Sequence, residues 1–263
     1  MPADDFAPGT VWLVGAGPGD PELLTRRAER LLRGATIVFY DALVGPAVLD
    51  LIPDGVVRVP VGKRSGRHSR DQATIDQLLV RAAERGERVV RLKGGDPSMF
   101  GRAAEELKAL AGAGITARIC PGITAASAAA ASAGISLSLR GLARRVQFVT
   151  AHAAHGRQLD LAWRDLADGR STLAFYMGRA AAGDIARGLT GAGLAGSTPV
   201  LIACDVSLPG ERLLRTRLDL LPLAVEAISD DKPTLMLIGD AVADANYGVA
   251  VAANPAVAVE RAR

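Results

Sequence analysis

The segment best suited to ligand chemistry is Arg91–Pro97, which reads Arg-Leu-Lys-Gly-Gly-Asp-Pro. It follows the apolar pair Val89-Val90 and precedes a helical pattern that ends at Gly112. We therefore place it at the carboxyl end of a strand, where open α/β sheets bind ligands. Two glycines permit a close backbone approach, and Asp96 favours a ligand with hydroxyls, amines or a positive centre over a bare phosphate. The same residues also suit an ordinary strand-to-helix turn.

Three other segments carry polar side chains near predicted strand ends. Asp41 ends an apolar run, and a basic, glycine-spaced loop, residues 62–68, follows another. That loop suits either a surface loop or an anion-binding loop, and its composition does not separate the two. Arg102, Glu105 and Glu106 fall on the first turns of the helix after the Gly-Gly-Asp turn, where a solvated helix face is the ordinary explanation.

The elements that must position these residues begin with a βαβ unit. A strand over residues 11–14 leads into the turn Gly15–Pro21, a helix that ends at Gly34, and a strand over residues 36–40. The turn does not fit a dinucleotide fingerprint, because Asp20 stands where glycine or alanine is needed. It does fit a GxGxG turn of the kind common in methyltransferases, in which case Asp41 could hold a ribose.

Strand and helix patterns alternate along the rest of the chain, which predicts an α/β fold. We expect an N-terminal α/β domain over residues 10–134 and a C-terminal α/β domain over residues 135–243. Residues 1–9 and 244–263 lack periodicity, and we expect both ends to be disordered. An alanine-rich helix opens after Pro121-Gly122 and ends at Gly134, and its small side chains allow close packing on a sheet or a ligand.

The composition excludes several classes of protein. Hydrophobic residues make up 49%, aromatic residues only 4%, and the net charge is +3. Without aromatic platforms or dense basic runs we expect no nucleic acid and no membrane partner. Cys120 and Cys204 lie far apart and indicate buried thiols in a reducing cytoplasm. The acidic start does not resemble a signal peptide, and the three histidines do not form a metal motif, so we expect no metal.

Six stretches occur together in an order that resembles the tetrapyrrole methylase family, and within it the enzymes that methylate uroporphyrinogen III. The resemblance covers roughly residues 11–242. The stretches are Gly15–Asp20 with Leu23-Leu24-Thr25, Val38–Val44, Val61–Arg64, Arg91–Pro97 with Phe100-Gly101-Arg102, Pro121–Ala126, and Tyr176-Met177-Gly178.

The resemblance implies two α/β domains of the class III methyltransferase type, with the active site in the cleft between them, and a homodimer. It implies S-adenosyl-L-methionine as methyl donor, S-adenosyl-L-homocysteine as product, and C-methylation of uroporphyrinogen III at C2 and C7, which gives precorrin-2 through precorrin-1 for sirohaem or cobalamin. Carried across, the catalytic residues are Asp41 as proton acceptor, Lys63 as proton donor, and Arg102. The cofactor contacts are Pro18, Gly94, Gly95, Asp96, Met99, Thr124, Ala125, Met177 and Val206.

The chain departs from the family pattern at four places. Ala103-Ala104 replace two glycines, Leu139 replaces a histidine, Ala151 replaces a glycine, and Val206 stands where the family's glycine contacts the cofactor. Val206 can still offer its backbone, although its Cβ crowds the ligand. The departures leave open a methyltransferase for a later corrin precursor, of precorrin-2 or precorrin-4 type. A nicotinamide-dependent oxidoreductase and a non-catalytic adenosylmethionine-binding regulator are alternatives of other classes.

Overall fold

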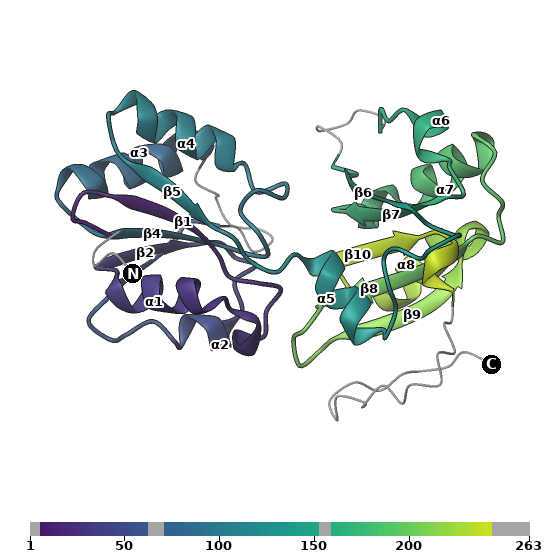
Figure 1. The fold of residues 1–263 in the computed structure, drawn as a ribbon, viewed down its shortest axis with the longest axis horizontal. Helices are drawn as coiled ribbons and strands as arrows, with labels where there is room; N and C mark the ends of the chain where they lie inside the picture. The colour runs from purple at the N-terminus through teal and green to yellow at the C-terminus, as the bar shows by residue number, and fades with distance from the viewer. Residues whose placement is uncertain (1–5, 63–70, 153–158, 244–263) are drawn as a thin grey trace. The chain divides into compact units, whose positions relative to one another are not determined.

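A computed structural model describes residues 6–62, 71–152 and 159–243. The chain divides into two compact units, Met1–Thr124 and Ala125–Arg263. Each unit is built around one five-stranded sheet with helices packed on it (Figure 1). This arrangement confirms the predicted α/β fold class.

The first unit contains a fully parallel sheet. Its strands are β1 (Val11–Gly15), β2 (Ile37–Tyr40), β3 (Val57–Pro60), β4 (Val89–Lys93) and β5 (Ala117–Cys120), in the order β3-β2-β4-β1-β5. All four strand pairs run parallel. Every residue of β1 and β4 is buried, as expected for central strands covered on both faces.

Helices cover both faces of this sheet (Figure 1). They are α1 (Arg26–Gly34), α2 (Pro46–Leu49), α3 (Gln72–Glu84) and α4 (Ala103–Gly112), with a 3₁₀ segment, η1, at Pro21–Leu23. Trp12 and Val14 of β1 pack with α1, whereas Leu13, on the other face, packs with α3 and α4. Side chains of Thr25 and Asp71 cap α1 and α3 by accepting hydrogen bonds from backbone N–H groups.

The strand order brings the loops of interest together at the carboxyl ends of the strands, which we call the carboxyl edge of the sheet. β1 lies between β4 and β5, so the turns that follow β1 and β4 leave neighbouring strands side by side. The chain then continues from β1 to α1 on one face and from β4 to α4 on the other face. Such a reversal at the carboxyl ends of parallel strands is where α/β sheets bind ligands.

The second unit contains a mixed sheet in the order β6-β7-β10-β8-β9. Its strands are β6 (Arg145–Thr150), β7 (Ser171–Tyr176), β8 (Pro199–Cys204), β9 (Arg212–Arg217) and β10 (Thr234–Ile238). β6 and β7 are parallel, whereas β10 runs antiparallel to β7 and β8, and β9 runs antiparallel to β8. The sequence pattern missed β9, because this half-exposed edge strand carries three arginines in six residues.

The helices of the second unit are α5 (Ala125–Ser132), α6 (Trp163–Leu166), α7 (Ala182–Gly191) and α8 (Leu221–Ile228), with 3₁₀ segments η2 (Arg179–Ala181), η3 (Leu218–Leu220) and η4 (Asp240–Val242). Helices α6 to α8 share a core with one face of the sheet. Helix α5 contacts β10, and its buried alanines allow this close approach. None of the helices in the described ranges is long and apolar enough to cross a membrane.

The division between the units differs from the predicted boundary. It falls between Thr124 and Ala125, so that α5 belongs to the second unit and not to the first. The reason is that α5 packs on β10, a contact that local sequence does not reveal. The predicted disorder of residues 1–9 is also wrong for Phe6, which is buried in the core beneath α1. Residues 1–5 and 244–263 lie outside the described residues.

Candidate active site

Three glycine turns meet at the carboxyl edge of the first sheet. Gly17 and Gly95 exchange two backbone hydrogen bonds, of 3.1 and 2.7 Å. A Cβ on Gly122 would lie 2.3 Å from the Gly95 carbonyl oxygen and 2.8 Å from the Gly15 Cα. Only glycine permits such an approach, because the atoms in the way belong to the backbone. The Gly15–Gly19 turn and the Gly-Gly-Asp turn therefore form one structure.

The backbone of Gly95 adjoins open space in this arrangement. Gly95 has a φ of +67°, and a Cβ there would meet no atom within 4 Å. A Cβ on Gly94, in contrast, would lie 3.0 Å from the Leu43 Cβ. Pro18 and Met99 are half-buried near this edge. A ligand can therefore approach the Gly95 Cα without meeting a side chain, while the Gly95 N–H and C=O are both hydrogen-bonded to Gly17.

Asp96 organises the turn through its carboxylate. One carboxylate oxygen accepts a hydrogen bond from the Gly122 N–H at 2.9 Å, and the other accepts one from the Ser98 N–H at 2.8 Å as well as one from the Ser98 hydroxyl. These contacts show that Asp96 fixes the turn itself. Any contact with a ligand would come in addition to this structural role.

Asp41 follows β2 and lies beside the same edge. Its carboxylate accepts a hydrogen bond from the Arg91 Nη2 at 2.5 Å, and its side chain remains 26% exposed. Gly62 packs against the Asp41 backbone, since a Cβ on Gly62 would lie 2.9 Å from the Asp41 Cα. Lys63, the predicted proton donor, lies outside the described residues.

A buried charge network continues from Asp41 into the unit. The Arg91 Nε donates to Glu106 at 2.9 Å, and the Lys93 Nζ donates to both Glu106 oxygens at 3.0 and 3.1 Å. Glu106 is fully buried, which corrects its interpretation as part of a solvated helix face. The sequence did contain a signal: two bases two residues apart on a central strand point to the same face and require a buried counter-charge.

The network shifts the pKa values of its two bases in opposite directions. Burial by itself lowers the pKa of Arg91, but the carboxylates of Asp41 and Glu106 outweigh it, so the pKa is raised. Burial lowers the pKa of Lys93, and the Arg91 charge adds to this effect, while Glu106 and Asp41 oppose it. Arg91 is therefore a permanent donor to Asp41.

Arg102, the third predicted catalytic residue, is exposed and caps the start of α4. Its backbone is left-handed, with a φ of 57°, and its side chain is 56% exposed. The guanidinium donates to the Glu105 carboxylate at 2.8 and 2.5 Å. This hydrogen bond raises the pKa of Arg102 and lowers that of Glu105. Arg102 and Glu105 thus form an ion pair at the surface.

The other predicted cofactor residues fall in two groups. Thr124 is the last residue of the first unit, whereas Ala125, Met177 and Val206 belong to the second. Met177 has a left-handed backbone and is 49% exposed after β7. The Tyr176 hydroxyl accepts a hydrogen bond from the Ala126 N–H at 3.1 Å, which joins the start of α5 to the end of β7.

Val206 follows β8 at the same edge of the second sheet. Cys204, the last residue of β8, and Tyr176, the last of β7, both lie at the end where β10 begins. Val206 is buried, and its neighbours Asp205 and Ser207 both have positive φ values. The structure therefore brings the predicted residues of the second unit to one edge of its sheet.

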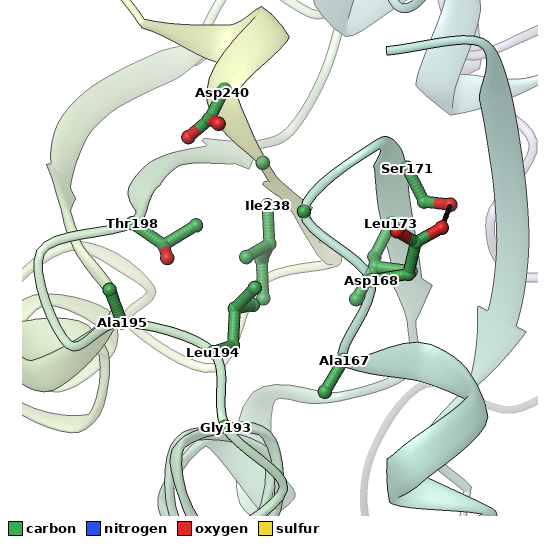
Figure 2. A pocket seen from close by; sticks show the side chains of 12 residues that line it. Ala167, Asp168, Ser171, Leu173, Gly193, Leu194, Ala195, Thr198, Ile238 and Asp240 are labelled. Atoms are coloured by element: carbon green, nitrogen blue, oxygen red, sulfur yellow. Dashed lines mark hydrogen bonds between the residues drawn. The ribbon is translucent and has the colours of Figure 1, made fainter. Parts of the chain in front are cut away.

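A cavity of about 270 Å³ lies at the opposite edge of this sheet (Figure 2). Asp168, Ser171, Thr198 and Asp240 surround an apolar floor of Leu173, Leu194 and Ile238. Figure 2 shows the Ser171 hydroxyl directed at Asp168, to which it donates at 3.1 Å. Ser171 opens β7 and Ile238 closes β10, so the cavity is separate from the end that carries Met177 and Val206.

Comparison with curated proteins gives related biosynthetic enzymes. The chain is 47% identical to the siroheme synthase of Azotobacter vinelandii over 234 residues, which cover 89% of this chain and 50% of the relative. It is 45% identical to the siroheme synthase of Pseudomonas fluorescens, over 91% of this chain and 52% of the relative. The chain thus spans about half the length of the curated relatives it matches.

Comparison with solved structures gives methyltransferases that act on tetrapyrroles. A uroporphyrin-III C-methyltransferase from Thermus thermophilus, complexed with S-adenyl homocysteine, is 38% identical with a TM-score of 0.76, over 89% of this chain and 93% of that one. A cobalt precorrin-4 methyltransferase is 27% identical with a TM-score of 0.80, over 92% and 98%. The family model described as tetrapyrrole (corrin/porphyrin) methylases matches residues 10–222. The chain therefore belongs to the tetrapyrrole methylase family.

Proposed function

We propose that this protein transfers methyl groups from S-adenosylmethionine to carbon atoms of uroporphyrinogen III. The observation that carries the proposal is the 38% identity to the Thermus thermophilus uroporphyrin-III C-methyltransferase over 93% of that chain. The siroheme synthases that the chain matches over half their length support a tetrapyrrole substrate. The proposed products are precorrin-1 and then precorrin-2, after methylation at C2 and C7.

The alternative is methylation of a later corrin precursor, of precorrin-2 or precorrin-4 type. It is favoured by the TM-score of 0.80 to cobalt precorrin-4 methyltransferase, against 0.76 for the uroporphyrin-III enzyme. We give more weight to identity, which is 38% against 27%. Backbone similarity reports the fold that the whole family shares, whereas higher sequence identity indicates a nearer relative within the family.

The residues at the sheet edge fit an adenosylmethionine ligand. The open space beside Gly95 lets a ligand approach its Cα with no side chain in the way. We propose that the contacts with the ligand are made by Pro18, Gly94, Gly95, Asp96, Met99, Thr124, Ala125, Met177 and Val206. Bound adenosylmethionine would supply an activated methyl group on a sulfonium.

The protein's own task is then mainly positioning, because an in-line displacement needs the two reacting atoms aligned. A proton must leave the pyrrole ring after methylation, and we propose that Asp41 accepts it. Asp41 suits this role because its carboxylate is partly exposed while Arg91 fixes its orientation. We propose Lys63 as proton donor and Arg102 as a group that handles the proton or a substrate carboxylate.

We also propose that the protein is a homodimer and that it is cytoplasmic. The family resemblance supports a homodimer, and two buried cysteines that form no disulfide support a cytoplasmic protein. Light scattering on the purified protein tests the first point: twice the chain mass of 27.2 kDa is expected. A monomer at micromolar concentration would contradict it.

Product mass tests the function. Purified protein is incubated anaerobically with adenosylmethionine and enzymatically generated uroporphyrinogen III, and a reaction without adenosylmethionine serves as the control. A gain of two methyl groups is expected. A product with no added methyl group would contradict the proposed substrate. If calorimetry then still showed adenosylmethionine binding, methylation of a precorrin-2 or precorrin-4 type substrate would be the next measurement.

A further inference from the structure

The buried charge network at the end of β4 is connected by hydrogen bonds to a partly exposed carboxylate. Glu106 on α4 accepts from the Arg91 Nε at 2.9 Å, and the Arg91 Nη2 donates to Asp41 at 2.5 Å. The Arg91 Nη1 also donates to the Leu92 carbonyl at 3.2 Å. The guanidinium is planar and rigid, so fixing two of its nitrogens determines the direction of the third.

Burial distinguishes Asp41 from the other members of the network. The side chains of Arg91, Lys93 and Glu106 are 3%, 4% and 0% exposed, whereas that of Asp41 is 26% exposed. Glu106 therefore has no access to substrate, and Asp41 is the member that reaches the surface. The connection from Glu106 to the surface passes through Arg91.

Stability alone is a weak explanation for this arrangement. Buried ion pairs contribute little net stability, because desolvation opposes their attraction. A Lys93–Glu106 pair would already neutralise both charges, yet Glu106 also binds Arg91. The contact of Glu106 with Arg91 fixes the guanidinium that donates to Asp41.

We propose that Glu106 is a positioning residue: it anchors Arg91, and Arg91 holds the Asp41 carboxylate in the orientation in which it accepts the substrate proton. This inference rests on the proposed function, since it assigns Asp41 the role of proton acceptor. Glu106 touches no substrate and acts only through Arg91.

The test compares two variants that disrupt the same buried ion pair. Glu106→Gln removes the negative charge that anchors Arg91, whereas Lys93→Met removes the other partner of Glu106 and leaves the connection from Glu106 to Asp41 intact. We expect Glu106→Gln to lower kcat by about 10- to 100-fold with KM for adenosylmethionine unchanged, as for a misplaced catalytic group. Lys93→Met should lower stability and reduce kcat less than Glu106→Gln does, because the hydrogen bonds from Arg91 to Glu106 and to Asp41 remain.

A double-mutant cycle separates positioning from a general structural defect. In an Asp41→Asn background, Glu106→Gln should cause no further loss of kcat, because the group that it positions is already gone. Equal fold-losses in both backgrounds would overturn the proposal, as would a Glu106→Gln enzyme with wild-type kcat. Glu87→Gln is a folding control. Glu87 accepts a hydrogen bond from Thr36 just before β4 and β2 begin, at the opposite end of these strands from Arg91 and Asp41.

A crystal structure of the Glu106→Gln variant gives a readout that needs no substrate. The expected result is an Arg91 side chain that has moved away from Asp41. An unchanged Arg91–Asp41 hydrogen bond would overturn the inference whatever the protein methylates. A wild-type protein without activity on uroporphyrinogen III would instead contradict the proposed function, and this structure would still decide the role of Glu106.

Discussion

Asp41 is the residue on which the proposed chemistry depends most directly. Its position after β2 followed from the sequence, but its partner did not, since Arg91 is fifty residues away along the chain. The parallel pairing of β2 with β4 brings Tyr40 opposite Leu92 and so places Asp41 beside Arg91. The carboxylate is consequently held from inside the unit while it still reaches solvent.

Asp41→Asn should lower kcat strongly and leave adenosylmethionine binding intact. An amide of the same shape keeps the packing but cannot accept a proton, and loss of a general base typically costs about 10²- to 10⁴-fold in rate. Single-turnover product formation and calorimetry measure the two effects. A variant with wild-type turnover would remove Asp41 from the mechanism.

Asp96→Ala should weaken adenosylmethionine binding mainly by loosening the turn. The change leaves the part-buried Gly122 N–H without its acceptor, which costs about 1 to 3 kcal/mol, and it also removes the acceptor of the exposed Ser98 N–H. Calorimetric affinity for adenosylmethionine and the melting temperature should therefore fall together. Ser98→Ala is the matched control, because it removes only the hydroxyl contact. Wild-type affinity in Asp96→Ala would contradict a role of this turn in binding.

Among the elements, the glycine turns after β1, β4 and β5 act as one structural part. Gly15, Gly95 and Gly122 approach so closely that backbone atoms touch backbone atoms. The central position of β1 in the sheet makes this meeting possible. A side chain at Gly15 or Gly122 displaces main chain, which relaxes far less readily than a flexible side chain.

Gly122→Ala should destabilise the first unit by about 1 to 3 kcal/mol, the usual range for overpacking. The new Cβ would lie 2.3 Å from the Gly95 carbonyl oxygen. Gly55→Ala is the control, because a Cβ at that exposed turn meets no atom within 4 Å. Urea unfolding of both variants measures the difference, and equal midpoints would show that the turns are not tightly packed.

At the scale of the whole molecule, the chain consists of two units with separate cores. Each unit holds one buried free cysteine, Cys120 in the first and Cys204 in the second. Burial raises the pKa of both thiols. The titration of each thiol therefore affects the stability of its own unit.

Stability of each unit should fall at alkaline pH through its cysteine. A raised pKa means that the folded state favours the neutral thiol, so this contribution is complete below about pH 8.5 and is lost as pH rises through the pKa of the folded thiol. Urea unfolding at pH 7.5 and pH 10 should show a smaller alkaline loss for Cys204→Ala than for wild type. An identical loss in both proteins would mean that the Cys204 thiol does not titrate with folding.

The sequence alone determined the elements whose signals are local. Apolar runs, turn glycines and capping residues such as Asp20 identified the strands of the first sheet and the α/β class, because these preferences act within a few residues. The ordered set of motifs indicated the tetrapyrrole methylases, which the family model confirms over residues 10–222.

Only the tertiary structure decided which residues meet. The strand order β3-β2-β4-β1-β5 does not follow the chain, and it joins the glycine turns into one edge and places Asp41 beside Arg91. Glu106 looked like a surface acid because its helix is amphipathic only in part, yet it is buried opposite two strand bases. Likewise α5, nearly all alanine, carried no sign of which sheet it covers. Such contacts join residues far apart in the chain, so packing of the whole unit selects them and local preference does not.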